Sequence, residues 1–146
     1  MKENEKYMKE AFLQAKKAYE LDEVPVGAVV VFNKKIIANA HNMSESLNNF
    51  TAHAELLALN QASKNLNSKY LNQCELYVTK EPCLICAGAI MLSRIKKLHF
   101  GASDIKKGYR FYNKNLFLNK IEVNYGILEQ ECSLILKDFF KLKRKK

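Results

Sequence analysis

The chain has 146 residues, 48% of them hydrophobic and 27% charged, which favours a single globular domain over residues 1–146 with a core of its own. Its 24 Lys and Arg residues outnumber its 15 Asp and Glu residues, and the resulting net charge of +9 suits either a nucleic-acid partner or a solvated lysine-rich surface. No stretch reaches the roughly 18 apolar residues of a membrane span, and the first ten residues alternate Lys with Glu instead of forming an apolar signal segment, so we expect a cytoplasmic protein without a membrane partner.

The first third of the chain predicts a helix followed by a β-hairpin. Apolar residues recur at spacings of three and four from Tyr7 to Tyr19, which predicts an amphipathic helix that ends near Leu21. The β-branched run over 26–32 predicts a strand that is covered on both faces. A short turn then leads into residues 35–40, so we expect these two strands to be antiparallel.

Two further helices are indicated in the middle of the chain. A polar loop over 41–50 ends at Thr51, which predicts the N-cap of a helix over 52–65. Pro82 suits the first turn of the next helix, because the N–H that proline lacks is not needed there. Residues 84–92 are apolar almost all round, so we expect this helix to be buried.

Strands alternate with these helices towards the C-terminus. Residues 75–79 and 97–101 have the composition of strands, 121–123 predict a short last strand, and 128–142 show apolar residues at helical spacing. The pattern weakens over 102–119. Alternating strands and helices imply crossover connections, so we expect an α/β fold with a mixed sheet whose later strands run parallel.

Two short motifs carry the chemistry. His53 and Glu55 form a His-x-Glu motif, and Cys83 and Cys86 form a Cys-x-x-Cys motif. Two thiolates and an imidazole suit tetrahedral zinc, and three protein ligands leave one position for water. Both motifs lie near predicted helix starts, where the helix dipole favours thiolates. Glu55 could move the protons of this water without being a ligand, provided that it shares the first helical turn with His53.

Each motif alone has other interpretations. A lone His53 is more often a capping or core residue. The Cys-x-x-Cys motif could be a redox pair, or half of a structural zinc site, which would need four protein ligands; the chain has no second such motif. Cys74 and Cys132 are solitary, and we expect them to be small buried residues.

Together, the motifs and their surroundings resemble bacterial tRNA-specific adenosine deaminases, which belong to the zinc-dependent cytidine/deoxycytidylate deaminase superfamily with its H-x-E and P-C-x-x-C signature. The similarity covers nearly the whole chain in order and spacing. The matching segments are 23–29, 41–42, 51–55, 76–79, 81–83, 86–89, 93–95, 100–102, 126–128, 131–132 and 138–140. The resemblance implies a three-layer α/β/α cytidine-deaminase-like fold with a mixed central sheet of about five strands and helices on both faces.

The resemblance also implies an activity and its cofactor. His53, Cys83 and Cys86 would hold one zinc ion per subunit, and Glu55 would carry protons while the wobble adenosine of a tRNA anticodon stem-loop is converted to inosine with release of ammonia. It further implies a homodimer.

Substrate-binding residues follow from the same resemblance. Asn42 would hydrogen-bond the flipped nucleoside, Val26 would form a wall of the pocket, and the backbone of Ala54 and Cys83 would contact the base. Asp104 would meet the RNA backbone next to the target. Without the resemblance, Asn42 and Asp104 would be interpreted as a turn residue and a helix N-cap.

Two basic and aromatic segments bear on the substrate. The resemblance places Phe139, Phe140 and Lys141, with the basic tail that continues to Lys146, beside the RNA. Residues 109–112, Tyr-Arg-Phe-Tyr, depart from the family, which has small residues there. Their rings could stack on anticodon-loop bases or pack internally.

Two rival functions remain open. A deaminase of a free base or nucleoside, such as guanine or cytosine, would use the same zinc and Glu55 but would have no use for Asp104 or the basic helix end. A non-catalytic, zinc-stabilised RNA-binding module would keep the metal ligands and the cations but would not require Glu55.

Overall fold

The computed structural model describes residues 2–144, so Lys145 and Lys146 of the basic tail lie outside the described residues. The elements are α1 (Glu3–Glu20), β1 (Gly27–Phe32), β2 (Lys35–His41), α2 (Ala54–Leu66), β3 (Glu75–Lys80), α3 (Leu84–Ser93), β4 (Lys97–Ala102), α4 (Tyr109–Tyr112), β5 (Glu122–Tyr125) and α5 (Glu129–Arg144). Apart from the short α4, which falls where the sequence pattern weakens, they follow the predicted order. The predicted α/β class is confirmed. Over the described range, no helix combines the length and hydropathy that a membrane span requires.

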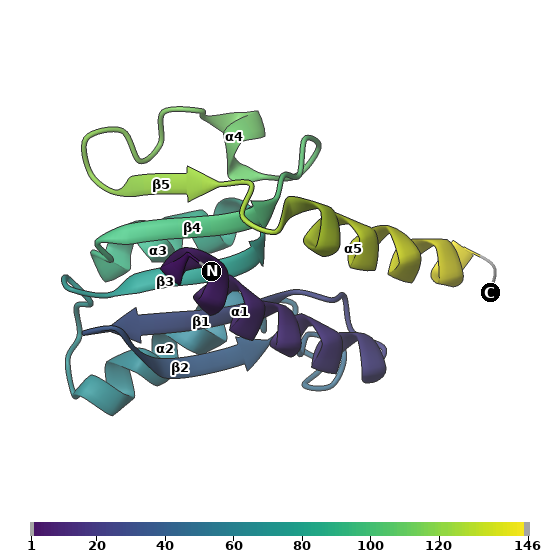
Figure 1. Ribbon diagram of the computed structural model, residues 1–146, viewed down its shortest axis with the longest axis horizontal. Coiled ribbons are helices and arrows are strands. Elements are labelled where there is room, and N and C mark those ends of the chain that lie inside the picture. The colour runs from purple at the N-terminus through teal and green to yellow at the C-terminus, as the bar shows by residue number, and fades with distance from the viewer. Residues whose placement is uncertain (1, 145–146) are drawn as a thin grey trace.

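A mixed five-stranded sheet forms the middle layer, in the order β2-β1-β3-β4-β5. Strand β1 is antiparallel to β2 and β3, whereas β4 is parallel to β3 and β5, as the crossover pattern predicts. Helices α1 and α5 lie on one side of the sheet, and α2 and α3 lie on the other (Figure 1). This is the three-layer arrangement expected of the cytidine-deaminase-like fold.

Strand β1 shows why both faces of the sheet are covered. Val29 and Val31 pack in the cluster on the α1 side, whereas Ala28 and Val30 pack in the cluster on the α2 side. Gly27 allows helix α1 to approach strand β1 closely, because a Cβ atom at this position would lie 2.0 Å from the backbone oxygen of Ala11. Helix α1 therefore rests directly on the backbone of the strand, and no other residue would permit this distance.

Two helix starts differ from the predictions. His53, not Thr51, is the N-cap of α2, with φ −84° and ψ 150°. The Thr51 hydroxyl instead donates to the side-chain oxygen of Asn49 at 2.8 Å, so a loop contact takes the group that would have capped the helix. Pro82 precedes the N-cap of α3, Cys83, and lies outside the first turn. Both shifts place a candidate metal ligand at a helix N-cap.

Helix α3 is buried on one face only, so the prediction of a fully buried helix was wrong. Cys86 and Ile90 are fully buried against the core, whereas Leu84, Ile85 and Leu92 are 49%, 53% and 78% exposed. The sheet covers one side of the helix and no other described element covers the opposite side. Adjacent exposed apolar side chains of this kind mark a contact surface.

His99 places a titratable ring inside the sheet layer. It is 3% exposed, its Nε2 lies 2.7 Å from Glu75 Oε1, and its ring stacks on Tyr77 with centroids 4.1 Å apart. Burial lowers the pKa of His99 below its ordinary value of 6.5, and Glu75 opposes this effect only in part. The unfolded chain therefore binds the proton better than the folded protein does. The contribution of His99 to stability is complete above about pH 6.5 and declines as the pH falls below it.

We predict that His99→Gln makes the free energy of unfolding less dependent on pH. From neutral to mildly acidic pH, the wild-type protein should lose stability more steeply than the variant, because only the wild-type protein has this ring to protonate on unfolding. Urea denaturation, monitored by circular dichroism at one fixed zinc concentration, measures the free energy of unfolding of both proteins at each pH. The other titrating groups are common to both proteins, so the difference between the two pH profiles isolates the contribution of His99. Parallel pH profiles for the two proteins would contradict the prediction.

Candidate metal centre and cavity

The starts of α2 and α3 meet at one point. His53 is the N-cap of α2, Cys83 is the N-cap of α3, and Cys86 lies in the first turn of α3. Their ligand atoms all lie within 4.8 Å of one another. His53 Nδ1 is 3.3 Å from Cys86 Sγ and 3.6 Å from Cys83 Sγ. The structure thus brings together the three predicted zinc ligands, at helix ends whose dipoles favour thiolates.

The charges of the two sulfur atoms depend on each other. Hydrogen bonds from Cys86 and from His53 lower the pKa of the Cys83 thiol to about 3. The contact with Cys83, together with burial, raises the pKa of Cys86. Neighbouring thiolates repel each other, and a divalent cation stabilises both. One imidazole nitrogen and two sulfur atoms at this spacing fit zinc, which takes such donors in a tetrahedral set.

Glu55 lies beside this cluster in the first turn of α2. Its side chain is 5% exposed and lines the same cavity as His53 and Cys83. Burial raises the pKa of the Glu55 carboxyl, and the nearby Cys83 adds to this effect. The requirement that Glu55 share the first turn with His53 is met because His53 is the N-cap. A buried carboxyl in this position can exchange protons with a molecule in the cavity.

A cavity of about 680 Å³ opens from the cluster beyond the carboxyl ends of β3 and β4. Crevices at this end of the strands are where open α/β sheets bind ligands, and the volume suits a small organic ligand. The predicted substrate-binding residues that line it are Val26, Asn42, Ala54, Asp104 and Phe140.

The remaining two predicted residues of α5 lie outside the cavity lining. Phe139 is 6% exposed, and its ring meets that of Tyr19 edge-on with centroids 6.0 Å apart, so it packs α5 against α1. Lys141 is exposed and does not line the cavity, whereas Lys137 and Arg144 do. Arg144 belongs to the basic tail that the resemblance placed beside the RNA, but Lys137 was not indicated, because helical spacing alone does not say which polar face meets a cavity.

Asn42 reaches the cavity from the loop after β2. It is 6% exposed, and within residues 2–144 its Oδ1 atom has no hydrogen-bond partner. A buried, unpaired acceptor costs free energy, so this placement suits a ligand that donates a hydrogen bond. Glu23 holds the same loop, accepting from the Glu45 N–H at 3.0 Å and from Ser46 Oγ at 2.6 Å. No motif pointed to this supporting role of Glu23.

Asp104 and Glu81 form one wall of the cavity. Burial opposes ionisation of Asp104, but its bonds to Lys80 Nζ at 2.9 Å and to the Lys107 N–H at 3.0 Å lower its pKa. Glu81 directly precedes the Pro-Cys segment and is 2% exposed; it binds the Arg110 guanidinium at 2.8 Å and the Asp104 N–H at 3.0 Å. Arg110, in the segment that departs from the family, is thereby tied to the metal-ligand loop.

The rings of this departing segment divide between packing and exposure. Tyr109 is 2% exposed and packs against Phe117, with ring centroids 4.8 Å apart. Phe111 and Tyr112 are 65% and 59% exposed. Internal packing therefore accounts for Tyr109 but not for the other two rings.

Comparison with known proteins identifies the family. The MafB19-like deaminase family matches residues 2–144. The tRNA-specific adenosine deaminase of Bacillus subtilis (strain 168) is 48% identical over 151 aligned positions, which cover 100% of this chain and 94% of that protein. A solved structure from a study of A-to-I editing by tRNA:A34 deaminases at the wobble position has a TM-score of 0.83 and 39% identity, covering 90% of this chain and 99% of that chain. The guanine deaminase from Nitrosomonas europaea shares the fold at 25% identity, with a TM-score of 0.82 over 92% of this chain and 83% of that one. The chain therefore belongs to the family of tRNA-specific adenosine deaminases.

Proposed function

We propose that the protein converts the wobble adenosine of a tRNA anticodon loop to inosine, consuming water and releasing ammonia. The observation that carries this proposal is the buried carboxyl of Glu55 beside the three-residue donor cluster, inside a cavity lined by Lys and Arg side chains. The 48% identical relative, a tRNA-specific adenosine deaminase, supports a tRNA substrate.

The proposed catalytic roles follow from the positions of the side chains. His53, Cys83 and Cys86 would hold one zinc ion per chain, and zinc supplies Lewis acidity that makes water nucleophilic near neutral pH. Glu55 would take a proton from this water, deliver it to the ring nitrogen, and then assist protonation of the amino group that leaves as ammonia. Because the carboxyl is buried, bulk water does not compete for these protons.

The other cavity residues would hold the nucleoside. The unpaired Asn42 Oδ1 would accept a hydrogen bond from the flipped nucleoside, Val26 would pack against the base, and the backbone of Ala54 and Cys83 would contact its edge. Asp104 is held ionised by its partners, so it would accept from a ribose hydroxyl and avoid a phosphate. The 2′-hydroxyl, present only in RNA, is a suitable donor.

We predict that Lys137 and Arg144 contact phosphates of the RNA. Replacing both with glutamine should weaken binding of an anticodon stem-loop about tenfold and reduce the slope of log Kobs against log salt by about 1–2, as expected when two phosphate contacts are lost. Fluorescence anisotropy over a salt series measures both quantities. Lys141→Gln is the matched control on the same helix, because this side chain lies outside the cavity lining. An equal effect of Lys141→Gln would contradict a specific contact at the cavity.

The assembly belongs to the same proposal. We propose a single domain over residues 1–146 that acts in the cytoplasm, where a tRNA substrate would be met, as a homodimer with one zinc ion per subunit. The exposed side chains of Leu84, Ile85 and Leu92 on α3 support a contact between copies. Light scattering of the purified protein tests the dimer.

One assay tests the proposed activity against its rival. Purified protein with zinc is incubated with a total tRNA pool, which is then sequenced for A-to-I changes at the wobble position; free guanine and cytidine are assayed in parallel for ammonia release. Inosine at the wobble position supports the proposal. Free guanine is included because the fold is similar to that of a guanine deaminase. If guanine releases ammonia while the tRNA pool remains unmodified, the proposal is overturned.

A further inference from the structure

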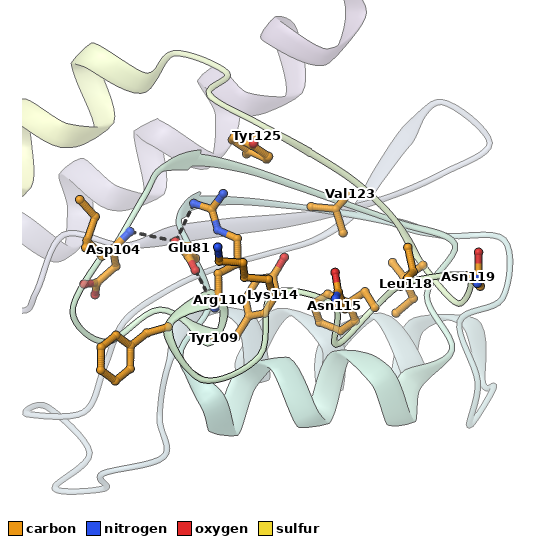
Figure 2. Close-up of a pocket in the computed structure, with 14 residues that line it drawn as sticks. Glu81, Asp104, Tyr109, Arg110, Lys114, Asn115, Leu118, Asn119, Val123 and Tyr125 are labelled. Carbon is orange, nitrogen blue, oxygen red and sulfur yellow. Dashed lines mark hydrogen bonds and ion pairs between the residues drawn. The ribbon is translucent and has the colours of Figure 1, made fainter.

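A second hollow adjoins the cavity. A groove of about 750 Å³ lies between β5 and the segment that follows α4. Glu81 and Asp104 line both this groove and the cavity at the metal centre. Figure 2 shows the groove running from Asp104 towards Asn119, with Tyr125 of β5 on one side and Lys114 on the other. A chain-like ligand that leaves the cavity past Asp104 would enter the groove directly.

The groove combines exposed rings with an unpaired cation, and two more unpaired cations lie in the adjoining cavity. Phe111 and Tyr125 line it and are 65% and 60% exposed. Lys114 lines the groove, and Lys106 and Lys107 line the adjoining cavity. Within residues 2–144, none of these three lysines forms a salt bridge. Aromatic faces beside uncompensated positive charge are the surface that unpaired nucleic acid uses.

The acidic groups of the shared wall do not cancel this charge. The Glu81 carboxylate is paired with Arg110, and Asp104 is paired with Lys80. The charge that remains available in the groove is therefore that of Lys114, and it favours an anionic ligand over an apolar or basic protein segment; the exposed rings beside it favour an anion that carries bases to stack.

The floor of the groove is held in place before any ligand binds. The guanidinium carbon of Arg110 lies 4.4 Å from the Tyr125 ring centroid and 5.0 Å from that of Phe100, while its Nη2 atom binds Glu81. At Gly108, a Cβ atom would lie 2.6 Å from the backbone oxygen of Asp104 and 2.3 Å from the Glu81 carboxylate, so a side chain there would force the loop away from Asp104. A preformed surface of this kind loses little conformational entropy on binding.

We propose that this groove binds an unpaired nucleotide of the RNA that flanks the target adenosine. The proposal rests on the proposed function, because the flanking nucleotide is continuous with the adenosine in the cavity. Its base stacks on Phe111 or Tyr125, and its phosphate faces Lys114. The side-chain amides of Asn115 and Asn119, which also line the groove, supply donors and acceptors for the edge of the base.

Binding of a fluorescent anticodon stem-loop by the full-length, zinc-loaded protein tests the groove. Phe111→Ala should weaken binding about 5- to 100-fold, the range for loss of one stacked base, and Phe111→Tyr, which keeps a ring, should restore most of it. Lys114→Gln should lower the salt slope by about 0.7. Lys120→Gln removes the same charge from the same segment, outside the groove, and should leave the slope unchanged. For Phe111→Ala, KM should rise while kcat at saturating RNA stays near wild type.

The possible results separate the groove from the activity. If Phe111→Ala and Lys114→Gln bind RNA as the wild-type protein does while wobble adenosine is still deaminated, the groove is not an RNA site and the proposed function stands. If the wild-type protein neither binds the stem-loop nor deaminates it, both proposals fall. If light scattering shows that Phe111→Ala changes the oligomeric state, the groove is a contact between copies and the RNA assignment is overturned.

Discussion

Replacing Glu55 with alanine is expected to abolish deamination while the protein keeps one zinc ion per chain. The side chain is 5% exposed and lines the cavity, but it is not one of the three donor residues. A general acid–base residue contributes about 10²- to 10⁴-fold to the rate, so kcat should fall at least about a hundredfold. Sequencing of the treated tRNA measures the activity, and elemental analysis of the same sample measures the zinc.

Two companion variants separate proton transfer from packing. Glu55→Gln keeps the size of the side chain but cannot accept the proton, so it should be about as inactive as the alanine variant. Asn60→Ala changes an exposed position of the same helix and should keep both activity and zinc. Activity retained in Glu55→Gln would remove the proton-transfer role, and loss of zinc from it would make Glu55 part of the metal site.

Local sequence patterns predicted the elements whose side chains pack on the sheet. The apolar spacing of α1 and the β-branched run of β1 depend on burial of one helix face and both strand faces, and both appear where expected. The metal cluster could also be predicted, because its chemistry needs few residue types. Its geometry could not, because the loop contact between Thr51 and Asn49 decides which residue becomes the N-cap of α2.

Contacts between residues that are far apart in the chain could not be predicted from the sequence. Glu81 and Arg110 are 29 positions apart, and a lone Glu or Arg is usually solvated. Their pairing becomes visible only when the loop after β4 closes over the start of α3. The face of α5 that lines the cavity could not be predicted either, because the helix has cations on several faces. Its packing against α1 and β4 directs Lys137 and Arg144, and not Lys141, to the cavity.

Cys83→Ser is expected to release zinc and to lower the unfolding temperature, because free energy of metal binding to the folded state is also free energy of folding. A ligand present at a thousand times its Kd stabilises the folded state by about 4 kcal/mol. For a chain of this size, such a loss corresponds to roughly 8–16 °C in unfolding temperature. Elemental analysis and thermal unfolding, each with and without a chelator, measure the two effects.

The chelator distinguishes lost metal from damaged packing. The wild-type protein should lose stability when zinc is removed, whereas Cys83→Ser should unfold at the same temperature with and without the chelator. Cys132→Ser is the matched control: this cysteine is fully buried against Gly101 and is not one of the three donor residues, so its loss should lower stability through packing and leave the response to the chelator intact. A Cys83→Ser protein that keeps stoichiometric zinc and still responds to the chelator would show that the metal is held elsewhere, and the catalytic assignment of Glu55 would lose its basis with it.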